Sequence, residues 1–257
     1  MESIYEISAA EKVNAQNEST QNENGQNENG QNENKQGDNP VENAYGEERK
    51  NVAWENRAKE PSKGIMHGLK IGVAVCGSFC TFKKAFEAAA ELKKMGADII
   101  PVMSFNAASI SSRFGTAEEN LAAFENIAGR KAILTIEDAE PIGPKKMTDI
   151  MLLPNCTGNT LAKLAMSITD TPVTMAVKSH LRGNRPVVIN AATNDALSGS
   201  AKNIGALMNL RNYYFVPLRQ DDFAKKPTSV VGDFSLIPDT IIYALSGRQI
   251  QPVLREL

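Results

Sequence analysis

The chain has 257 residues and a formal net charge of −2 at pH 7. A charge balance this close to neutral gives no positive field that would hold a nucleic acid by releasing its counterions, so no nucleic-acid partner is expected. The first residues carry neither the basic nor the apolar segment of a secretion signal, and no apolar run is long enough to span a bilayer. We therefore expect a cytoplasmic protein without a membrane segment.

Three cysteines, Cys76, Cys80 and Cys156, form an odd set without the spacing of a metal site. Such a set is typical of a reducing compartment in which thiols stay free, so we expect neither disulfides nor a bound metal. Cys76 and Cys80 are expected to be buried or half-buried packing residues, because the sequence shows no neighbouring base that would activate a thiolate.

Polar repeats of Gln-Asn-Glu-Asn-Gly fill residues 16–39, with almost no apolar side chain. Such a segment cannot bury enough surface to offset the backbone entropy lost on ordering, so it should be disordered. We expect the disordered tail to span residues 1–65 and a single folded domain to span residues 66–257.

From residue 69 onward, apolar runs alternate with helical patterns. The expected strands are 69–76, 98–103, 132–136, 149–153, 186–191 and 213–216. The expected helices are 81–95, 117–127, 161–168, 173–181, 202–210 and 234–245. Strands that alternate with helices predict an α/β fold whose parallel sheet is covered on both faces. In such open sheets ligands bind beyond the carboxyl ends of the strands, so the loops there carry the candidate site.

The first loop after an expected strand contains Gly77 and Ser78, at the start of a helix. Free N–H groups and the helix dipole favour a phosphate at such a place. The loop lacks the Gly-x-Gly-x-x-Gly spacing of a dinucleotide fold and the lysine of a P-loop, which disfavours NAD(P) and ATP on this chain. An ordinary capped helix explains the loop equally well, and both interpretations stay open.

A more specific loop, residues 154–165, follows the strand expected at 149–153. The hydroxyls of Thr157 and Thr160 can donate hydrogen bonds to phosphate or ribityl oxygens. The Asn159 side chain can donate and accept, and Gly158 would let the backbone approach a flat ring closely. From residue 157 to 165 this segment resembles the flavoprotein family of peptidyl-cysteine and phosphopantothenoylcysteine decarboxylases and flavin prenyltransferases. Their motif reads Pro-Ala-Ser-Ala-Asn-Thr before an Ala-Lys-Leu-Ala helix, and only the proline is displaced here, by one residue.

A narrower resemblance, to the B subunits of dipicolinate synthases, covers residues 68–257 and rests on short segments in a fixed order. They are Gly77-Ser78-Phe79-Cys80-Thr81, Arg113-Phe114-Gly115, Glu140-Pro141-Ile142-Gly143-Pro144-Lys145-Lys146, Thr157-Gly158-Asn159-Thr160, Thr169-Asp170-Thr171-Pro172-Val173, Thr193-Asn194-Asp195, Phe215-Val216-Pro217, Gln220-Asp221-Asp222, Lys225-Lys226-Pro227 and Gln251-Pro252-Val253-Leu254. Residues 66–70 match the usual beginning of such subunits, which suggests that the tail is an addition and makes Met66 one of two candidate starts, beside Met1.

This resemblance implies a flavodoxin-like, Rossmann-like three-layer sandwich whose partner is the A subunit of dipicolinate synthase. The pair would oxidise dihydrodipicolinate, or its hydroxytetrahydro precursor, to dipicolinic acid in the mother cell of a sporulating bacterium. The chain would then be part of an oxidoreductase and active only with the A subunit. FMN is the cofactor that the family implies for this chain, whereas NAD(P) is expected on the A subunit. Self-association into a homo-oligomer is also implied.

Candidate cofactor-binding residues lie in the loops after the expected strands: Gly77, Ser78, Ser104, Thr157, Gly158, Asn159, Thr160, Thr193 and Asn194. The implied substrate is a nitrogen ring with two carboxylates, which needs cationic groups to orient it. The candidates for these contacts are Arg113, Lys145, Lys146, Lys225 and Lys226, with a solvated surface charge as the alternative for each of them. Candidate bases for removing a ring proton are Glu140, Asp221 and Asp222, provided that burial raises the pKa.

Decarboxylases of the wider family use a histidine in the loop after the third strand, where this chain has Glu137-Asp138-Ala139-Glu140. The two histidines of the chain, His67 and His180, are expected to be ordinary surface residues. Decarboxylation of a cysteinyl substrate is therefore disfavoured. The main alternative to a catalytic role is a scaffold that keeps the flavoprotein fold without its chemistry.

Overall fold

The structure, a computed structural model, describes residues 66–255. The predicted tail of residues 1–65, with its polar repeat, lies outside the described residues. The boundary between tail and domain at residue 66 therefore stays a prediction.

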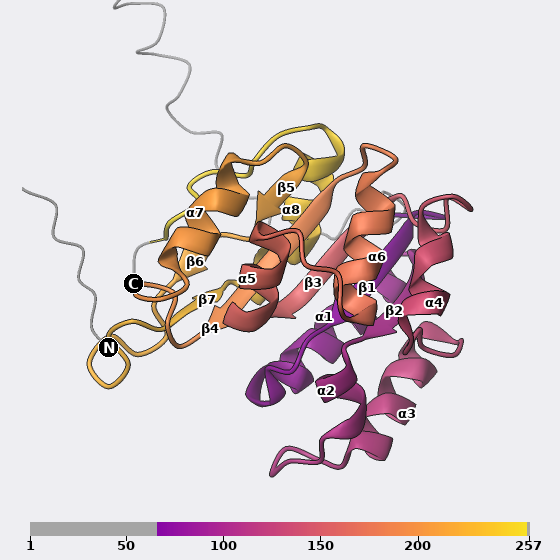
Figure 1. Ribbon diagram of the computed structural model, residues 1–257, viewed down its shortest axis with the longest axis horizontal. Helices are drawn as coiled ribbons and strands as arrows, with labels where there is room; N and C mark the ends of the chain where they lie inside the picture. The colour runs from indigo at the N-terminus through magenta and orange to yellow at the C-terminus, as the bar shows by residue number, and fades with distance from the viewer. Residues whose placement is uncertain (1–65, 256–257) are drawn as a thin grey trace, which may run out of the picture. The chain divides into compact units, whose positions relative to one another are not determined.

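A mostly parallel sheet lies at the centre of the described chain (Figure 1). Its seven strands are β1 (Lys70–Val75), β2 (Asp98–Met103), β3 (Ile150–Cys156), β4 (Val187–Thr193), β5 (Tyr213–Phe215), β6 (Leu218–Arg219) and β7 (Val230–Gly232). The strand order is β2-β1-β3-β4-β7-β6, and β5 pairs with β4 beside this path. β2, β1, β3, β4 and β5 run parallel in this order, which is the 2-1-3-4-5 order of flavodoxin-like folds. The predicted flavodoxin-like sheet is confirmed.

β4 pairs with different partners along its length. Residues 187–189 pair in parallel with β5, whereas Ala192 and Thr193 pair antiparallel with β7. β7 is itself one arm of an antiparallel hairpin with β6. Since Val230, the first residue of β7, lies opposite Thr193, the hairpin loop of residues 220–229 extends beyond the carboxyl end of β4.

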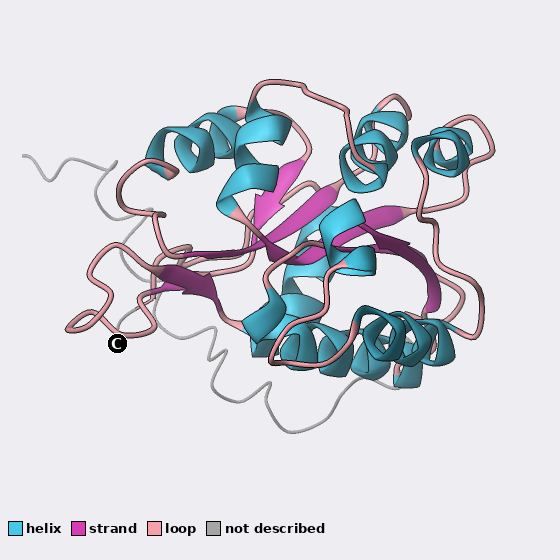
Figure 2. Cartoon of the chain, turned by 60° about the horizontal axis from the view of Figure 1, so that its bottom comes forward, coloured by secondary structure: helices cyan, strands magenta, loops and turns pink. Residues whose placement is uncertain are grey.

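Helices cover both faces of the sheet (Figure 2). They are η2 (Phe79–Thr81), α1 (Phe82–Lys94), α2 (Phe105–Ser109), α3 (Ala117–Ala128), α4 (Ile136–Ala139), η3 (Glu140–Ile142), α5 (Gly158–Ala165), α6 (Pro172–Leu181), α7 (Ala201–Asn209), η4 (Phe234–Leu236) and α8 (Ile237–Leu245). One buried cluster joins α1, α3 and α8 to the sheet, and another joins α5, α6 and α7 to it. Among residues 66–255, no helix combines the length and the apolar composition needed to cross a membrane.

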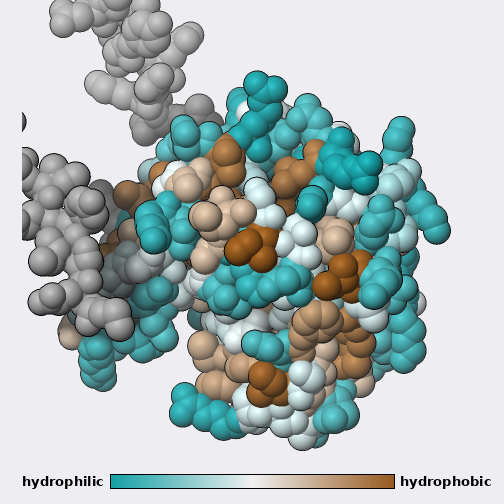
Figure 3. All heavy atoms as spheres, viewed as in Figure 1, coloured by the Kyte–Doolittle hydropathy of each residue, from teal (hydrophilic) through white to brown (hydrophobic). Residues whose placement is uncertain are grey.

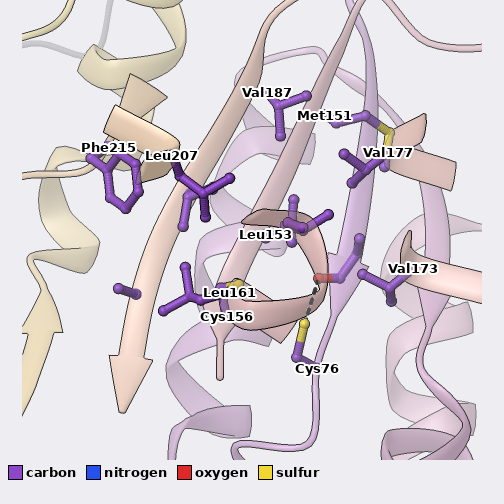
Figure 4. Packing of buried hydrophobic residues seen from close by; sticks show 14 of the residues in the cluster. Cys76, Met151, Leu153, Cys156, Leu161, Val173, Val177, Val187, Leu207 and Phe215 are labelled. Atoms are coloured by element: carbon purple, nitrogen blue, oxygen red, sulfur yellow. Dashed lines mark hydrogen bonds between the residues drawn. The ribbon is translucent and has the colours of Figure 1, made fainter. Parts of the chain in front are cut away.

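Alternate side chains of each strand enter the two clusters, as the period-two geometry of a strand requires. On β1, Ile71 and Val73 belong to the cluster under α1, α3 and α8, whereas Ala74 belongs to the cluster under α5, α6 and α7. Figure 4 shows the second cluster, to which both Leu153 of β3 and Leu161 of α5 belong. Because both faces are covered by apolar packing, the polar side chains gather in the loops at the two edges where the strands begin and end.

Local signals set the ends of α3. Thr116 accepts a hydrogen bond from the Glu119 N–H at 3.1 Å, and the Glu119 carboxylate accepts one from the Thr116 N–H at 3.0 Å. This reciprocal cap satisfies two N–H groups that a helix start would otherwise leave free. Gly129, with φ at 73°, ends the helix in the left-handed conformation that glycine adopts without steric cost.

The strand predicted at 132–136 is wrong. Only Ile133 makes an isolated bridge, with Val102, and Thr135 already caps α4 by accepting a hydrogen bond from the Asp138 N–H at 3.1 Å. A threonine followed by acidic residues favours a helix start, so the chain leaves the sheet after one bridge. The short α2 and the β6–β7 hairpin were not predicted either.

Candidate functional site

The loops after β1, β2, β3 and β4 gather at one edge of the sheet, because these parallel strands all end there. The strand order reverses between β1 and β3, since the chain passes from β1 to β2 on one side and continues from β3 to β4 on the other. Ligands of flavodoxin-like sheets bind at this reversal. Residues 77–78 and 157–160 flank it, as the sequence predicted.

Asn155, at the end of β3, fastens these two loops together. Its Nδ2 donates to the Cys76 carbonyl at 2.9 Å, and its Oδ1 accepts from the Cys76 N–H at 2.9 Å. A longer contact of 3.5 Å joins Nδ2 to the Ser78 carbonyl. Because Asn155 is fully buried, these bonds satisfy polar groups that no water reaches. The sequence interpretation did not single out this residue, although it lies within the loop of residues 154–165.

The start of α5 presents hydrogen-bond donors at this edge. Thr157 caps the helix by accepting from the Thr160 N–H at 3.3 Å, and the two hydroxyls lie 3.2 Å apart. The next two N–H groups, of Gly158 and Asn159, belong to the first helical turn, where no helical carbonyl can accept them. Asn159 is exposed. These groups, with the positive end of the helix dipole, form a site for oxygen-rich ligands.

Gly158 is required by packing inside the protein. A Cβ atom there would lie 2.6 Å from Ser200 Oγ, 2.8 Å from Thr193 Oγ1 and 2.9 Å from Asp195 Oδ1. The sequence suggested instead that this glycine leaves room for a flat ring. The structure shows that α5 uses it to approach the segment that follows β4.

Asp195 is the charged group of this segment, and the sequence interpretation did not assign it to the site. Its carboxylate accepts hydrogen bonds from the hydroxyls of Thr193 and Ser200, the latter at 3.0 and 2.9 Å to the two oxygens. The Thr193 hydroxyl, more than any other group, lowers the pKa of Asp195, and slight burial only partly opposes it. An ionised carboxylate therefore stands beside the first turn of α5.

Two predicted cofactor contacts are engaged in internal structure. Ser104 Oγ accepts from the Ala107 N–H at 3.3 Å and so caps α2. The Asn194 carbonyl accepts from the Thr228 hydroxyl at 2.7 Å, and its Oδ1 accepts from the Ser229 hydroxyl at 3.3 Å. Asn194 thus anchors the 220–229 loop to the site edge.

This anchored loop carries three further candidates, Asp221, Asp222 and Lys225. Asp222 Oδ1 accepts from the Lys225 N–H at 3.0 Å, and Asp221 pairs with Lys226 at 3.2 Å. Partial burial raises the pKa of Asp221, but hydrogen bonds from Ser229 and Lys226 outweigh it, and the net shift is downward. The raised pKa that a general base would need is therefore not found at Asp221.

Glu140 and Lys145 lie at the opposite edge of the sheet, in the segment that leads into the amino end of β3. Glu140 forms an exposed ion pair with Arg182 at 3.8 Å. Gly143 donates its N–H to Ser179 Oγ at 2.9 Å, and a Cβ on Gly143 would lie 2.1 Å from the Ser179 carbonyl oxygen. This motif is therefore a docking segment for α6, and within one chain it does not meet the Thr157 loop.

His180 is buried, which corrects the expected surface position; His67 is exposed, as expected. The His180 ring donates from Nε2 to the Pro186 carbonyl at 3.0 Å, so its Nδ1 accepts from the Thr148 hydroxyl at 2.8 Å. Burial lowers the pKa of His180 to about 4, although the Pro186 carbonyl opposes the shift. The residue is a neutral structural group remote from the carboxyl edge.

The cysteines divide by exposure. Cys76 and Cys156 are fully buried in the cluster of Figure 4, whereas Cys80 is exposed, contrary to the expected packing role. A hydrogen bond from Cys156 lowers the pKa of Cys76, and burial raises the pKa of Cys156. All three are free thiols.

Arg113 is exposed in the loop between α2 and α3. Its guanidinium lies 4.9 Å from the centroid of the Phe114 ring. Phe114 lines a cleft together with Phe79 and Cys80, which follow the Gly77 loop. The structure therefore brings the Arg113 motif next to the loop of residues 77–78.

Comparisons with known proteins agree with this geometry. A family model described as "Flavoprotein" matches residues 59–230. The B subunit of dipicolinate synthase from Bacillus subtilis (strain 168) is 44% identical over 191 residues, which cover 74% of this chain and 96% of that protein.

Solved structures point the same way. The dipicolinate synthase B subunit from Bacillus halodurans C superposes with a TM-score of 0.69 at 36% identity, over 74% of this chain and 98% of that one. The FMN-dependent cysteine decarboxylase SpaF (22% identity, TM-score 0.55, 70% and 98% covered) and HAL3 from Cryptococcus neoformans (16%, 0.52, 70% and 97%) share the fold. The chain belongs to the flavoprotein family and, within it, to the dipicolinate synthase B subunits.

Proposed function

We propose that the chain works together with the A subunit of dipicolinate synthase to oxidise dihydrodipicolinate, or its hydroxytetrahydro precursor, to dipicolinic acid. The chain would thus be one half of an oxidoreductase. The observation that carries this proposal is the 44% identity to the Bacillus subtilis protein, which extends over 96% of that protein. The loops of residues 77–78 and 157–160, here called the donor loops, lie at the carboxyl ends of β1 and β3, and the reaction would take place beside them. The mother cell of a sporulating bacterium is the proposed setting.

The groups at this edge fit FMN. The Gly158 and Asn159 N–H groups and the Thr160 hydroxyl supply donors at the start of α5, which suits the ribityl oxygens of the cofactor. The Ser78 hydroxyl, 4.0 Å from Cys80 Sγ, adds a further donor. We infer that the cofactor is held by Gly77, Ser78, Thr157, Asn159 and Thr160. Bound there, FMN would supply an acceptor for a hydride equivalent.

The ionised Asp195 carboxylate would orient this cofactor. Since it stands beside Gly158, it would repel a phosphate from the β4 side of the edge. The 77–78 loop, which has no carboxylate of this kind, is then the place for the phosphate. The Asp195 carboxylate would accept a hydrogen bond from an N–H or O–H group in the rest of the ligand.

The nicotinamide cofactor is proposed to bind to the A subunit. The present chain lacks the glycine spacing of a dinucleotide fold in the loop after β1, where such a cofactor would need it. Turnover would accordingly require both proteins. Self-association of this chain into a homo-oligomer is part of the same proposal.

A second candidate is a scaffold that stabilises the A subunit without chemistry of its own. Two of the expected cofactor contacts support it, because Ser104 is used to cap α2 and Asn194 is used to anchor the hairpin. The lowered pKa of Asp221 also removes one of the proposed bases.

The test is an absorbance spectrum of the protein purified together with its A subunit, followed by dipicolinate formation with a nicotinamide cofactor. Flavin bands are expected, and the double variant Thr157→Ala, Asn159→Ala should lose them together with most of the product formation. Asn209→Ala, which removes an exposed asparagine from the end of α7, is the matched control. A colourless complex with undiminished product formation in the double variant would contradict the enzyme role and support the scaffold.

A further inference from the structure

A cleft of about 500 Å³ lies between α1 and α3, beside the 77–78 loop. Its wall is aromatic: the rings of Phe79 and Phe82 have centroids 5.3 Å apart, and that of Phe86 lies 5.6 Å from Phe82. Phe114 lines the other side and is 45% exposed. Small-molecule pockets have volumes and apolar walls of this kind. The cofactor assignment leaves this cleft unused.

The wall is supported from behind. Phe86 stacks on the buried Phe124, with centroids 5.4 Å apart and planes 15° from parallel. Asn120, which also lines the cleft, donates from Nδ2 to the Thr116 carbonyl at 2.8 Å. Most of the other lining side chains are apolar, and the Asn120 amide is already engaged through one N–H. The buried part of a ligand should therefore be apolar and flat.

Charged side chains lie beside this apolar interior. Arg113 is not itself a lining residue, but its guanidinium lies over the ring of Phe114, which is. Within residues 66–255 no carboxylate comes within 4.0 Å of this guanidinium. Lys83 is 88% exposed and pairs with Glu87 at 4.0 Å, so Glu87 offsets one of the two positive charges. Arg113 remains as the cation that a carboxylate would meet. The cleft thus matches a ligand with an apolar ring and an anionic edge.

Apolar side chains also gather near this region of the surface. On the face shown in Figure 3, brown and tan residues lie over α2, next to the loop that carries Arg113 and Phe114. Phe105 and Ile110, at the two ends of α2, are 45% and 43% exposed. Their surface is open, whereas Phe79, Phe82, Phe86 and Phe114 line a cleft. A ring could be enclosed in the cleft, but not on the open surface.

We propose that this cleft binds a planar ring acid, with the ring between the phenylalanines and the carboxylates directed to Arg113. The identification of this acid as pyridine-2,6-dicarboxylate rests on the proposed function. In that acid both carboxylates flank the ring nitrogen, so the opposite edge is apolar and can enter the cleft first. A flat ring contacts phenylalanine rings across its whole face, whereas the puckered ring of a reduced precursor does not. The cleft would hold the product more tightly than the precursor.

The test is calorimetric titration of the full chain with pyridine-2,6-dicarboxylate. One equivalent is expected to bind, and Phe114→Ala and Arg113→Ala should each weaken binding at least about tenfold. Lys178→Ala removes an exposed positive charge from α6 and is expected to change nothing. The saturated piperidine-2,6-dicarboxylate and the isomer pyridine-3,5-dicarboxylate should bind more weakly than the 2,6-acid.

Circular dichroism of each variant shows whether its fold is retained, and Arg113→Ala removes a side chain that lies outside the core. Absence of binding to the unmodified chain, or unchanged binding in both folded variants, would overturn the proposal. Equal binding of the saturated ring would overturn its requirement for a planar ligand. If the chain carries flavin and forms dipicolinate with its A subunit, while the cleft binds no ring acid, only the cleft is refuted. The opposite pattern refutes the proposed function instead.

Discussion

His180 should make the stability of the fold depend on pH below neutrality. Burial holds its pKa at about 4, against an ordinary value of 6.5 that applies to the unfolded chain. As the pH falls below 6.5, His180 binds a proton in the unfolded chain but stays neutral in the folded chain. The free energy of unfolding therefore decreases. One pKa unit corresponds to about 1.4 kcal/mol, which gives a total loss of about 3 kcal/mol once the pH falls below 4. Between pH 7 and pH 5 the expected loss is about 2 kcal/mol.

The assay compares the unmodified chain with His180→Gln in urea unfolding at pH 7 and pH 5. Glutamine is neutral at both pH values and can keep a donor and an acceptor near the Pro186 carbonyl and the Thr148 hydroxyl. The variant should start less stable at pH 7, because its shape differs, yet it should lose about 2 kcal/mol less on going to pH 5. Equal losses in the two proteins would show that the folded chain protonates His180 readily, and the reasoning from its burial would be refuted.

Three further predictions concern residues at or near the carboxyl ends of β1 and β3. Gly158→Ala should lower the free energy of unfolding by about 1–3 kcal/mol, because its Cβ meets Ser200 Oγ at 2.6 Å, and adding Ser200→Ala should recover part of that loss. Asn155→Ala should cost at least about 2 kcal/mol in denaturant unfolding, since it leaves the buried N–H and carbonyl of Cys76 without their partner; a loss below that found for an exposed asparagine such as Asn209 would contradict the fastening role. A thiol reagent should modify one equivalent in the folded chain and three after unfolding, and Cys80→Ser should abolish the fast reaction; modification of all three thiols without unfolding would be inconsistent with two buried cysteines.

The framework of the fold was predictable because its buried strands can be recognised in the sequence as apolar runs. β1, β2, β3 and β4 all have six or seven residues, long enough to be distinguished from loops. The strand at 132–136 was wrongly predicted because three apolar residues precede Thr135. In the structure Thr135 caps α4, so the chain becomes helical there. β6 and β7 have only two and three residues, too few for a period to be visible.

The candidate site was partly predictable from topology. Residues that follow parallel strands must share an edge, which places the 77–78, 157–160 and 193–194 segments together. The same rule argues against Glu140 and Lys145, because they precede β3 and therefore lie at the other edge. The role of Asn155 depends on Cys76, 79 residues earlier in the chain, and only the pairing of β1 with β3 brings them together.

A sequence does not show whether a glycine serves ligand binding or internal packing. In the structure, Gly158 and Gly77 differ in this respect. A Cβ on Gly158 would collide with three side-chain oxygens, so this glycine serves the contact between α5 and the segment after β4. A Cβ on Gly77 would meet only Asn106 Cβ at 3.5 Å and the edge of the Phe79 ring at 4.0 Å, both ordinary contacts. Gly77→Ala should therefore leave the unfolding midpoint nearly unchanged while reducing flavin content in the purified protein, because the added methyl group would stand next to the proposed donors of the 77–78 loop. Gly158→Ala should show the larger loss of stability. If Gly77→Ala destabilises the fold as much as Gly158→Ala, or if it keeps its full flavin content, then the backbone of the β1 loop is not where the ligand approaches.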